Sequence, residues 1–547
     1  MPLFFFTLLL FIIPNSILFL NNGNYLNSVV WSILLSTLLL VSIRPKHYYF
    51  LLGFIWFLPV ACFYMYGYSR PLDTFLFSVI FDTNLEESES FFGSKFYPYV
   101  GIYLLFIIGT SYIYLSKRIP KTDFFPIKRK YIVAPFILVG LAYISYNYLT
   151  SRTLMGVYEK GKDTIQVGII DSYPVSLLYN GNLFKEEMFK IKDRKDQLKN
   201  FTFNSVQRDN GPDVVVLVLG ETSRRDRWGL NGYSRETTPL LSKKENLYNY
   251  TNALSLASAT LLSVPMTLTR KNEAKVLSVD YNESSIIKAF KEVGYSTYWL
   301  STQQKIGIFD SLTSYYASEA DNVSFFNFSN GSEDRDLDEV LINKLKDVLK
   351  KDNGKKFIVL HTMGSHQLYN KRYPASFDKF KPSTNDLKFY DPSNRKYKTE
   401  INNAYDNSIL YTDYILSQII DSVNDANKKS VVLYTSDHGE DLFDGDCNKT
   451  SHGGTSIYNF QVPLFVWVSN QYAVKYPSKV KVISGNTKKP INHTSIFPTL
   501  LSMSNISVKN FDDSRSLTNE KIKYDRFVFG NINFDSVKPK GVCKLLS

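Results

Sequence analysis

The sequence predicts an α-helical membrane domain over residues 1–150 and an α/β domain over residues 211–547. Two observations predict this division. Apolar runs of about twenty residues, the length that a bilayer crossing needs, crowd the first 150 residues. After residue 210, short β-branched runs alternate with longer stretches of helical periodicity, which is typical of a doubly wound, mostly parallel sheet with helices on both faces. Residues 151–210 form a polar, lysine-rich connector whose amphipathic pieces are expected to lie on a membrane surface.

Five apolar runs are close to the length of a membrane span. They cover residues 3–20, 28–43, 48–68, 98–116 and 131–149. A signal peptide is the alternative for the first run, but that run lacks a basic n-region and four more runs follow it, which favours a span.

The charges of the connecting loops orient these spans. Lysine and arginine gather in the loops after the second and the fourth span, with six of them between Lys117 and Lys130. The loop after the third span instead carries five acidic residues between Asp73 and Glu89. Because basic loops stay on the cytoplasmic side, the sequence predicts that everything after residue 150 is external.

The composition narrows the kinds of partner. The 547 residues carry a formal net charge of +12 at pH 7, but part of this excess lies in the membrane loops and no nucleic-acid module is present. We therefore predict attraction to anionic lipid or glycolipid surfaces and no nucleic-acid partner. Of three cysteines, Cys62 lies in a span, and Cys447 and Cys543 lie in the external part as one disulfide or two free thiols.

Several predicted strands end in residues with metal-binding chemistry. Glu221 ends VVVLVLGE, and Asp437 and His438 follow KKSVVLYTS. His366 lies in LHTMGSH and His452 in SHGG, just beyond other strand ends. Ligands of α/β sheets bind at the carboxyl ends of strands, so we expect these side chains to converge. Carboxylates and imidazoles are natural zinc ligands.

Other charged residues near these strand ends are interpreted as solvated or structural. His361 and His493 lack support from any motif and are expected to be structural. A solvated acidic loop is expected to follow His438, and its members are Glu440, Asp441, Asp444 and Asp446.

Thr260 lies in the small-residue stretch SATLLSVP, where a helix is expected to begin. A lone threonine at a helix start is most often a cap. The neighbouring SVPMT is similar to the formylglycine pattern of sulfatases, but Thr267 stands where that pattern has arginine, so a formylglycine sulfatase is not predicted.

Five motifs carry a more specific resemblance. They are LGETSRRDRWGLNGYSRETTPLL (219–241), SATLLSVP (258–265), LHTMGSHQLYNKRYP (360–374), TSDHGEDL (435–442) and SHGG (451–454). Together with five preceding spans, their order and spacing resemble the lipid-to-glycolipid phosphoethanolamine transferases, membrane enzymes of the alkaline phosphatase and sulfatase superfamily. The resemblance covers nearly the whole chain and implies a sulfatase-like α/β domain.

The resemblance implies a zinc site with a covalent mechanism. The residues that would hold one zinc ion are Glu221, Thr260, Asp437 and His438. Thr260 would be the nucleophile, because metal binding lowers the pKa of a hydroxyl that is otherwise unreactive at neutral pH. His366 and His452 match positions that contact the substrate phosphate or a second metal ion, and either would suit protonation of the departing oxygen.

Two segments match the family's substrate-binding positions more loosely. STQQKIG stands in place of an Asn-rich Ser-Gly loop, which makes Gln304 and Lys305 candidates for phosphate contact. DTNLEESESFF maps Thr83 and Glu87 to the donor headgroup site, where a carboxylate suits an ethanolammonium cation. Val79 replaces the asparagine of this pattern, and simple solvation of the loop is the alternative.

The resemblance implies a multi-pass enzyme of the bacterial inner membrane with its catalytic domain in the periplasm. Phosphatidylethanolamine would donate phosphoethanolamine to Thr260, and the group would pass to a lipopolysaccharide-type glycolipid, on lipid A or a core sugar. Two alternatives remain open. One is a phosphoglycerol transferase acting on a periplasmic glucan or teichoic-type polymer, and the other is a non-catalytic, membrane-anchored binding protein of the same fold.

Overall fold

The computed structural model forms two compact units, each described by itself. Unit 1 comprises Met1–Thr83 and Lys95–Phe189, and unit 2 comprises Asn84–Ser94 and Lys190–Ser547. The predicted boundaries at residues 150 and 210 remain predictions. The described residues are 2–21, 25–43, 45–68, 71–73, 76–77, 80–81, 96–116, 170–278, 281, 283–304, 312–327, 337–351, 354–388 and 390–546.

Unit 1 is helical and apolar. Its principal described helices are α1 (Pro2–Asn21), α2 (Leu26–Ser42), α3 (Leu52–Tyr68) and α6 (Phe96–Ser116), and α9 (Val175–Gln197) begins in this unit. Among the described residues, three helical segments are long and apolar enough to cross a membrane: Leu3–Asn21, His47–Gly67 and Phe96–Leu115. They match the first, third and fourth predicted spans, and the shorter apolar α2 covers the second. The fifth predicted span, 131–149, lies outside the described residues.

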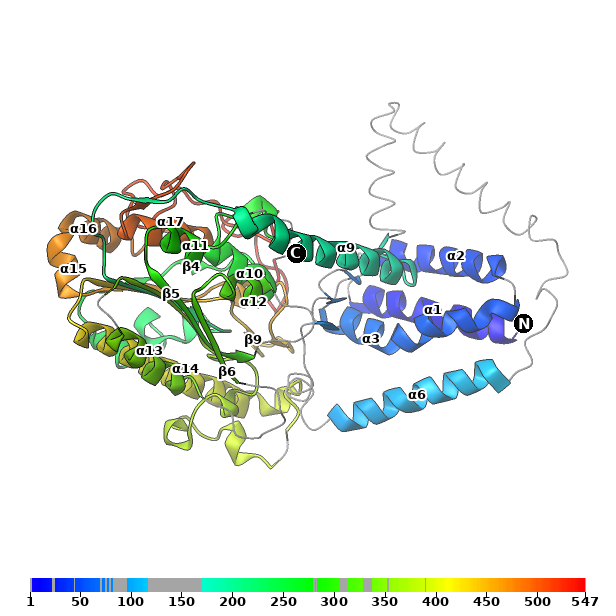
Figure 1. The fold of residues 1–547 in the computed structure, drawn as a ribbon. Coiled ribbons are helices and arrows are strands. Elements are labelled where there is room, and N and C mark those ends of the chain that lie inside the picture. Colours follow the sequence, from blue (N-terminus) through cyan, green and yellow to red (C-terminus); the bar gives the residue numbers. More distant parts are fainter. Residues whose placement is uncertain are drawn as a thin grey trace. The chain divides into compact units, whose positions relative to one another are not determined.

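A seven-stranded sheet forms the centre of unit 2 (Figure 1). Its strand order is β3-β11-β8-β2-β7-β5-β6, in which β11 runs antiparallel to both neighbours and the other pairs are parallel. The five apolar β-branched runs of the sequence, at residues 214–219, 297–300, 357–360, 431–434 and 464–468, all lie in strands, and β3 and β6 are additional. The bounds are β2 Val214–Gly220, β3 Leu247–Tyr250, β5 Ser296–Gln304, β6 Asn322–Asn327, β7 Lys356–His361, β8 Ser430–Ser436 and β11 Leu464–Val468.

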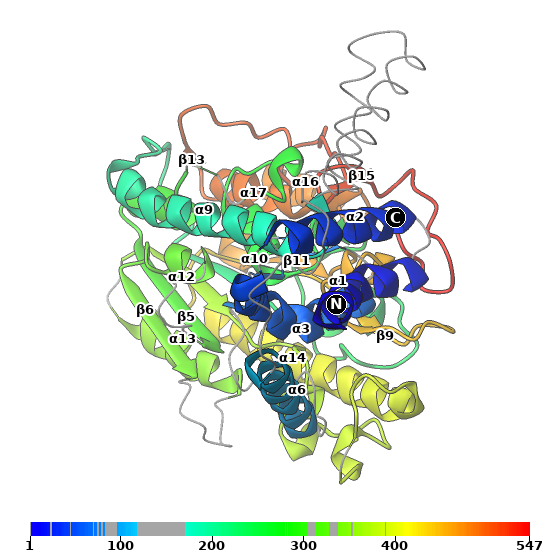
Figure 2. The ribbon, with the colours of Figure 1, turned by 90° about the vertical axis from the view of Figure 1, so that its right-hand side faces the viewer.

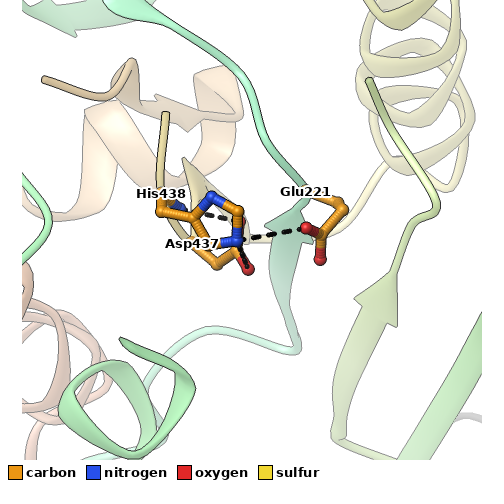
Figure 3. Close-up of side chains that lie close together, drawn as sticks. All are labelled: Glu221, Asp437 and His438. Atoms are coloured by element: carbon orange, nitrogen blue, oxygen red, sulfur yellow. Dashed lines mark hydrogen bonds and ion pairs between the residues drawn. The ribbon is translucent and has the colours of Figure 1, made fainter. Parts of the chain in front are cut away.

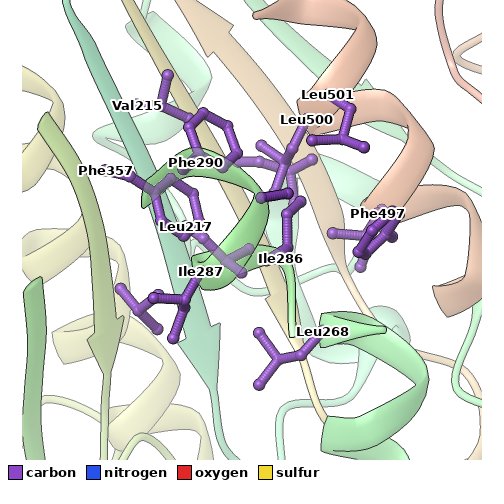
Figure 4. Packing of buried hydrophobic residues seen from close by; sticks show 14 of the residues in the cluster. Val215, Leu217, Leu268, Ile286, Ile287, Phe290, Phe357, Phe497, Leu500 and Leu501 are labelled. Carbon is purple, nitrogen blue, oxygen red and sulfur yellow. The ribbon is translucent and has the colours of Figure 1, made fainter. Parts of the chain in front are cut away.

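Helices cover both faces of this sheet, as predicted for a doubly wound fold. Alternate residues of β2 point to opposite faces: Val215 and Leu217 belong to one apolar core, and Val214 and Val216 to the other. Figure 4 shows the first core, where Phe290 of α11 stacks on Phe357 of β7 with ring centroids 4.1 Å apart. Figures 1 and 2 show α10 and α17 over that face and α13 and α14 over the other. These helices are α10 Thr260–Leu268, α11 Ile286–Glu292, α13 Glu339–Lys350, α14 Lys398–Asp425 and α17 Ile496–Met503.

Short elements complete unit 2. Its small two-stranded pairs are β1 (Val206–Gln207) with β13 (Ile506–Ser507), β4 (Ala253–Leu254) with β12 (Ile491–Asn492), β9 (Asp441–Leu442) with β10 (Thr450–Ser451), and β14 (Phe527–Val528) with β15 (Ile532–Asn533). The remaining helices are α12 (Leu312–Ala317), α15 (Asn470–Lys475) and α16 (Pro477–Gly485).

The register of the parallel strands brings the predicted site residues to one edge. Gly220 of β2 pairs with Ser436 of β8, so Glu221 and Asp437 leave the sheet side by side. His361 of β7 pairs with Leu219 of β2, which places the segment that carries His366 next to the same edge.

Candidate active site

Glu221 is buried directly after β2, and hydrogen-bond donors hold both of its carboxylate oxygens. The Thr222 hydroxyl donates to Oε1 at 2.6 Å, and the Gln303 amide nitrogen donates to Oε2 at 2.9 Å. Donors on both oxygens fix the orientation of the carboxylate and favour its charged form.

Asp437 and His438 lie beside Glu221, directly after β8. The backbone N–H groups of Thr222 and His438 donate to Asp437 Oδ1 at 3.0 and 2.7 Å, which leaves Oδ2 directed into the site. His438 Nδ1 lies 2.9 Å from the Gly439 carbonyl oxygen. An imidazole whose Nδ1–H donates to a carbonyl presents Nε2 as a free electron-pair donor, the usual arrangement of a metal-binding histidine.

Thr260 is the first residue of α10, and its hydroxyl points at the acidic cluster. Thr260 Oγ1 donates to Asp437 Oδ2 at 2.6 Å and lies 3.3 Å from Glu221 Oε2 and from His438 Nε2. The interpretation of Thr260 as a helix cap is wrong, because Ala259 is the N-cap residue and no side chain caps this helix.

The three side chains Glu221, Asp437 and His438 lie close together and could hold a metal ion (Figure 3). One ligand atom from each lies within 4.8 Å of the others. His438 Nε2 is 3.3 Å from Glu221 Oε1 and 3.3 Å from Asp437 Oδ2. An ion about 2.0 Å from four tetrahedral ligands separates those ligands by roughly 3.3 Å. The distances from His438 Nε2 to the two carboxylates and to Thr260 Oγ1 match this spacing, so with Thr260 Oγ1 as the fourth atom the cluster could hold a tetrahedral zinc ion. The 2.6 Å between Thr260 Oγ1 and Asp437 Oδ2 is shorter because these two atoms share a hydrogen bond.

The charges of these groups are strongly coupled. Burial and the charge of Glu221 raise the pKa of Asp437 to about 7. Burial lowers the pKa of His438, but the carboxylates of Asp437 and Glu221 outweigh it and raise that pKa to about 9. The hydrogen bond and charge of His438 in turn hold the pKa of Glu221 well below its usual value, against the effect of burial. A bound cation would stabilise all three groups in their deprotonated forms.

His366 and His452 lie next to this cluster. The ring of His452 is 4.5 Å from that of His438 and 5.6 Å from that of His366, measured between centroids. Burial lowers the pKa of His366 to about 4, and it also lowers the pKa of His452. Within the described chain, Nδ1 of each imidazole is buried without a hydrogen-bond partner. Each ring thus has a buried nitrogen without a hydrogen bond, and His452 Nδ1 lies 3.7 Å from Glu440 Oε2.

The expectation of a solvated acidic loop after His438 is wrong for most of its members. Glu440 is fully buried, its carboxylate accepts a hydrogen bond from Tyr369, and burial raises its pKa well above the usual value. Asp441 is also buried and accepts hydrogen bonds from Ser456 and Asn459.

A buried arginine explains why this acidic segment folds inward. The Arg224 guanidinium forms ion pairs with Asp226 at 2.6 Å and Asp444 at 2.8 Å, and it donates to the Glu440 carbonyl oxygen at 3.1 Å. It also stacks on the Tyr458 ring, 4.1 Å from the centroid. Of the four acids, Asp446 alone is solvent-exposed as expected, with 95% of its side chain accessible.

The predicted substrate contacts are placed only in part. Thr83, Glu87 and Lys305 lie outside the described residues, and the side chain of Gln304 is also outside them. The neighbouring Gln303 contacts Glu221.

His361 and His493 are buried and hydrogen-bonded, as expected for structural histidines. His361 Nδ1 lies 3.2 Å from the Ser301 hydroxyl, and His493 Nε2 lies 3.0 Å from the Ser436 carbonyl oxygen.

Sequence reasoning also missed Thr222 and Arg224, although both belong to the motif LGETSRRD. The sequence did contain a signal for these two residues. Thr222 directly follows the candidate metal ligand Glu221, and two arginines precede an aspartate shortly after it.

A disulfide joins the segment that follows His438 to the C-terminal tail. Cys447 and Cys543 are bonded, with their Cα atoms 4.7 Å apart. Of the two alternatives that the sequence left open, one disulfide or two free thiols, the structure has the disulfide, and among the described residues Cys62 is a free cysteine.

Comparison with known proteins agrees with this geometry. The Sulfatase family model matches residues 213–506. The chain belongs to the sulfatase family. Phosphoethanolamine transferase EptC of Escherichia coli (strain K12) is 24% identical over 548 aligned residues, covering 96% of this chain and 92% of the relative. Kdo(2)-lipid A phosphoethanolamine 7''-transferase of the same strain is 30% identical over 317 residues, covering 55% of this chain and 53% of the relative. The predicted resemblance to phosphoethanolamine transferases is confirmed.

Two solved structures share the fold of this sulfatase-family chain. The periplasmic domain of EptC from Escherichia coli in complex with Zn has a TM-score of 0.54 and 26% identity, covering 59% of this chain and 91% of that chain. The integral membrane protein lipooligosaccharide phosphoethanolamine transferase A from Neisseria meningitidis has a TM-score of 0.68 and 20% identity, covering 94% of this chain and 98% of that chain. The second match spans the apolar helices as well as the sheet, so it supports a membrane part joined to a sulfatase-like part.

Proposed function

We propose that this protein transfers phosphoethanolamine from phosphatidylethanolamine to a lipopolysaccharide-type glycolipid. The observation that carries the proposal is the position of the Thr260 hydroxyl, within 3.5 Å of Glu221, Asp437 and His438. The four donor atoms suit zinc, and a bound zinc ion would lower the pKa of the threonine hydroxyl and neutralise charge on the phosphoryl oxygens.

In the first displacement, Thr260 Oγ1 attacks phosphorus and forms a phosphoester bond, while the bond between phosphorus and the glycerol oxygen breaks. The Thr260 hydroxyl donates to Asp437 Oδ2 in a 2.6 Å hydrogen bond, and its proton leaves the site to solvent, because a bound cation would keep Asp437 deprotonated. Diacylglycerol leaves with a proton from His366 or His452. Burial lowers the pKa of both imidazoles, and a phosphate beside them would raise that pKa and let one of them gain this proton from solvent.

In the second displacement, an acceptor oxygen attacks the same phosphorus and the bond to Thr260 breaks. The imidazole takes the proton of the acceptor hydroxyl, and the threonine oxygen regains a proton from solvent. Substrate contact at Thr83, Glu87, Gln304 and Lys305 remains part of the proposal, as does a second ion at His366 and His452. Buried nitrogens without hydrogen bonds on both histidines favour a ligand there, whether phosphate or metal, and Glu440 lies 3.7 Å from the nitrogen of His452.

The named activities of the relatives indicate the acceptor and the compartment. A relative that modifies Kdo(2)-lipid A and a solved periplasmic domain of EptC support a lipid A or core-sugar acceptor and an external catalytic unit. We place unit 2 in the periplasm, joined to helices embedded in the inner membrane. The apolar helices of unit 1 support that anchoring.

The proposal is tested with the full chain in detergent, given labelled phosphatidylethanolamine and a purified lipid A acceptor. Mass spectrometry of the glycolipid should show added phosphoethanolamine, and Thr260→Ala should abolish it. Thr267→Ala is the matched control, because Thr267 is a buried hydroxyl of the same helix that donates only to the Ser263 carbonyl oxygen. A wild-type protein that transfers phosphoglycerol, or nothing, would contradict the proposal.

A further inference from the structure

Thr222 has an unusual backbone conformation between two carboxylates of the site. Its φ angle is +57°, in the left-handed region, and its side chain is fully buried. A β-branched residue is a genuine outlier there, because this conformation is sterically strained for it. Strain of this kind persists only where the surrounding contacts impose it.

Three atoms of Thr222 are held at once. Its N–H donates to Asp437 Oδ1 at 3.0 Å, and its hydroxyl donates to Glu221 Oε1 at 2.6 Å. Its carbonyl oxygen accepts a hydrogen bond of 2.7 Å from Tyr405, which is buried in α14. The left-handed turn allows one residue to donate to both carboxylates, so Thr222 sets their separation.

Gln303 completes this arrangement from a different strand. Its amide nitrogen donates to Glu221 Oε2 at 2.9 Å and to the Thr362 carbonyl oxygen at 3.1 Å. The second bond anchors the amide to the backbone that follows β7. Glu221 is therefore clamped between Thr222 on one oxygen and Gln303 on the other.

We infer that Thr222 and Gln303 are positioning residues that orient Glu221 and Asp437 toward a metal ion. The inference rests on the zinc site of the proposed function. Thr222 and Gln303 each donate to one Glu221 oxygen, so each of those oxygens keeps a second lone pair that faces Thr260 and His438. Because the Thr222 N–H occupies Asp437 Oδ1, the other oxygen, Oδ2, also faces Thr260 and His438. Removing such a donor typically weakens metal affinity by about 10–100-fold.

Thr222→Val tests this inference, because valine has the same shape and branching and lacks only the hydroxyl. Competition with a chelator should show zinc binding weakened at least about tenfold, whereas Thr222→Ser, which keeps the hydroxyl, should bind nearly as the wild type does. Thr237→Val is the matched control. Thr237 is equally buried, and its hydroxyl donates to the Arg227 carbonyl oxygen away from the cluster, so its loss should leave zinc affinity unchanged.

The melting temperature of the zinc-free proteins separates positioning from simple destabilisation. We expect Thr222→Val and Thr237→Val to melt alike without zinc, and only the former to lose part of the stabilisation that zinc adds. If Thr222→Val does not fold, Gln303→Leu decides, since it removes the donor to the other oxygen and should also weaken binding about tenfold or more. Unchanged zinc affinity in these variants would overturn the inference while leaving the proposed function intact. A wild-type protein that binds no zinc would overturn both.

Discussion

The disulfide between Cys447 and Cys543 should contribute strongly to the stability of unit 2. The bonded residues are 96 positions apart. A cross-link that closes a loop of this length lowers the conformational entropy of the unfolded chain. This raises the free energy of unfolding by about 4.7 kcal/mol at 25 °C. Unit 2 has roughly 370 residues, and each contributes about 2.1 cal/mol/K to the entropy of unfolding. Loss of this free energy should therefore lower the Tm by about 6 °C.

The assay is thermal unfolding of the full chain in detergent, followed by near-ultraviolet circular dichroism. Cys447→Ala/Cys543→Ala should melt about 6 °C below the control Cys62→Ala, which removes a cysteine outside the bond. Reduction of the wild-type protein should produce the same shift. A Tm within about 1 °C of the control would refute the reasoning, because it would mean that the unfolded chain gains little freedom when the bond is absent.

Further outcomes follow from two buried charges. Arg224→Ala should destabilise unit 2 by about 3–5 kcal/mol, measured by urea unfolding, because Asp444 and the Glu440 carbonyl lose a buried partner; Arg225→Ala, a neighbouring arginine, should cost much less. Burial raises the pKa of Asp413 to about 6, above its ordinary value of 3.8. The folded state therefore holds this proton more tightly, so the stabilisation is complete below about pH 4 and is lost as pH rises through about 6. Asp413→Asn should flatten that decline, and an unchanged pH profile would contradict it.

The sheet and the principal site residues could be predicted because their signals are local. Continuous β-branched runs such as Val214–Leu219 require burial on both faces, and a strand so placed carries Glu221 to the ligand-binding edge. The strand β6, with the sequence NVSFFN, was not predicted because it lacks such a run. Its residues 322–326 are exposed or half-buried, as is usual for an edge strand. Pairing with β5 fixes the position of β6 in the sheet, and no local pattern in the sequence indicates this pairing.

The burial of Glu440 could not be predicted from its neighbours. Its surroundings depend on Arg224, which lies 216 positions away in the chain. Position 303 was missed for a similar reason. Gln303 lies 82 positions from Glu221 in the chain, and their contact depends on the pairing of β5 with β7 and of β7 with β2, which no local pattern displays.

The central claim is that Thr260 carries the transferred group. Its most direct test is peptide mass spectrometry of the full-length protein after incubation with phosphatidylethanolamine and no acceptor. The mechanism predicts a phosphoethanolamine adduct on the peptide that contains Thr260, absent from Thr260→Ala and lost when a glycolipid acceptor is added. An adduct on another residue, or full transfer activity in Thr260→Ala, would contradict the mechanism.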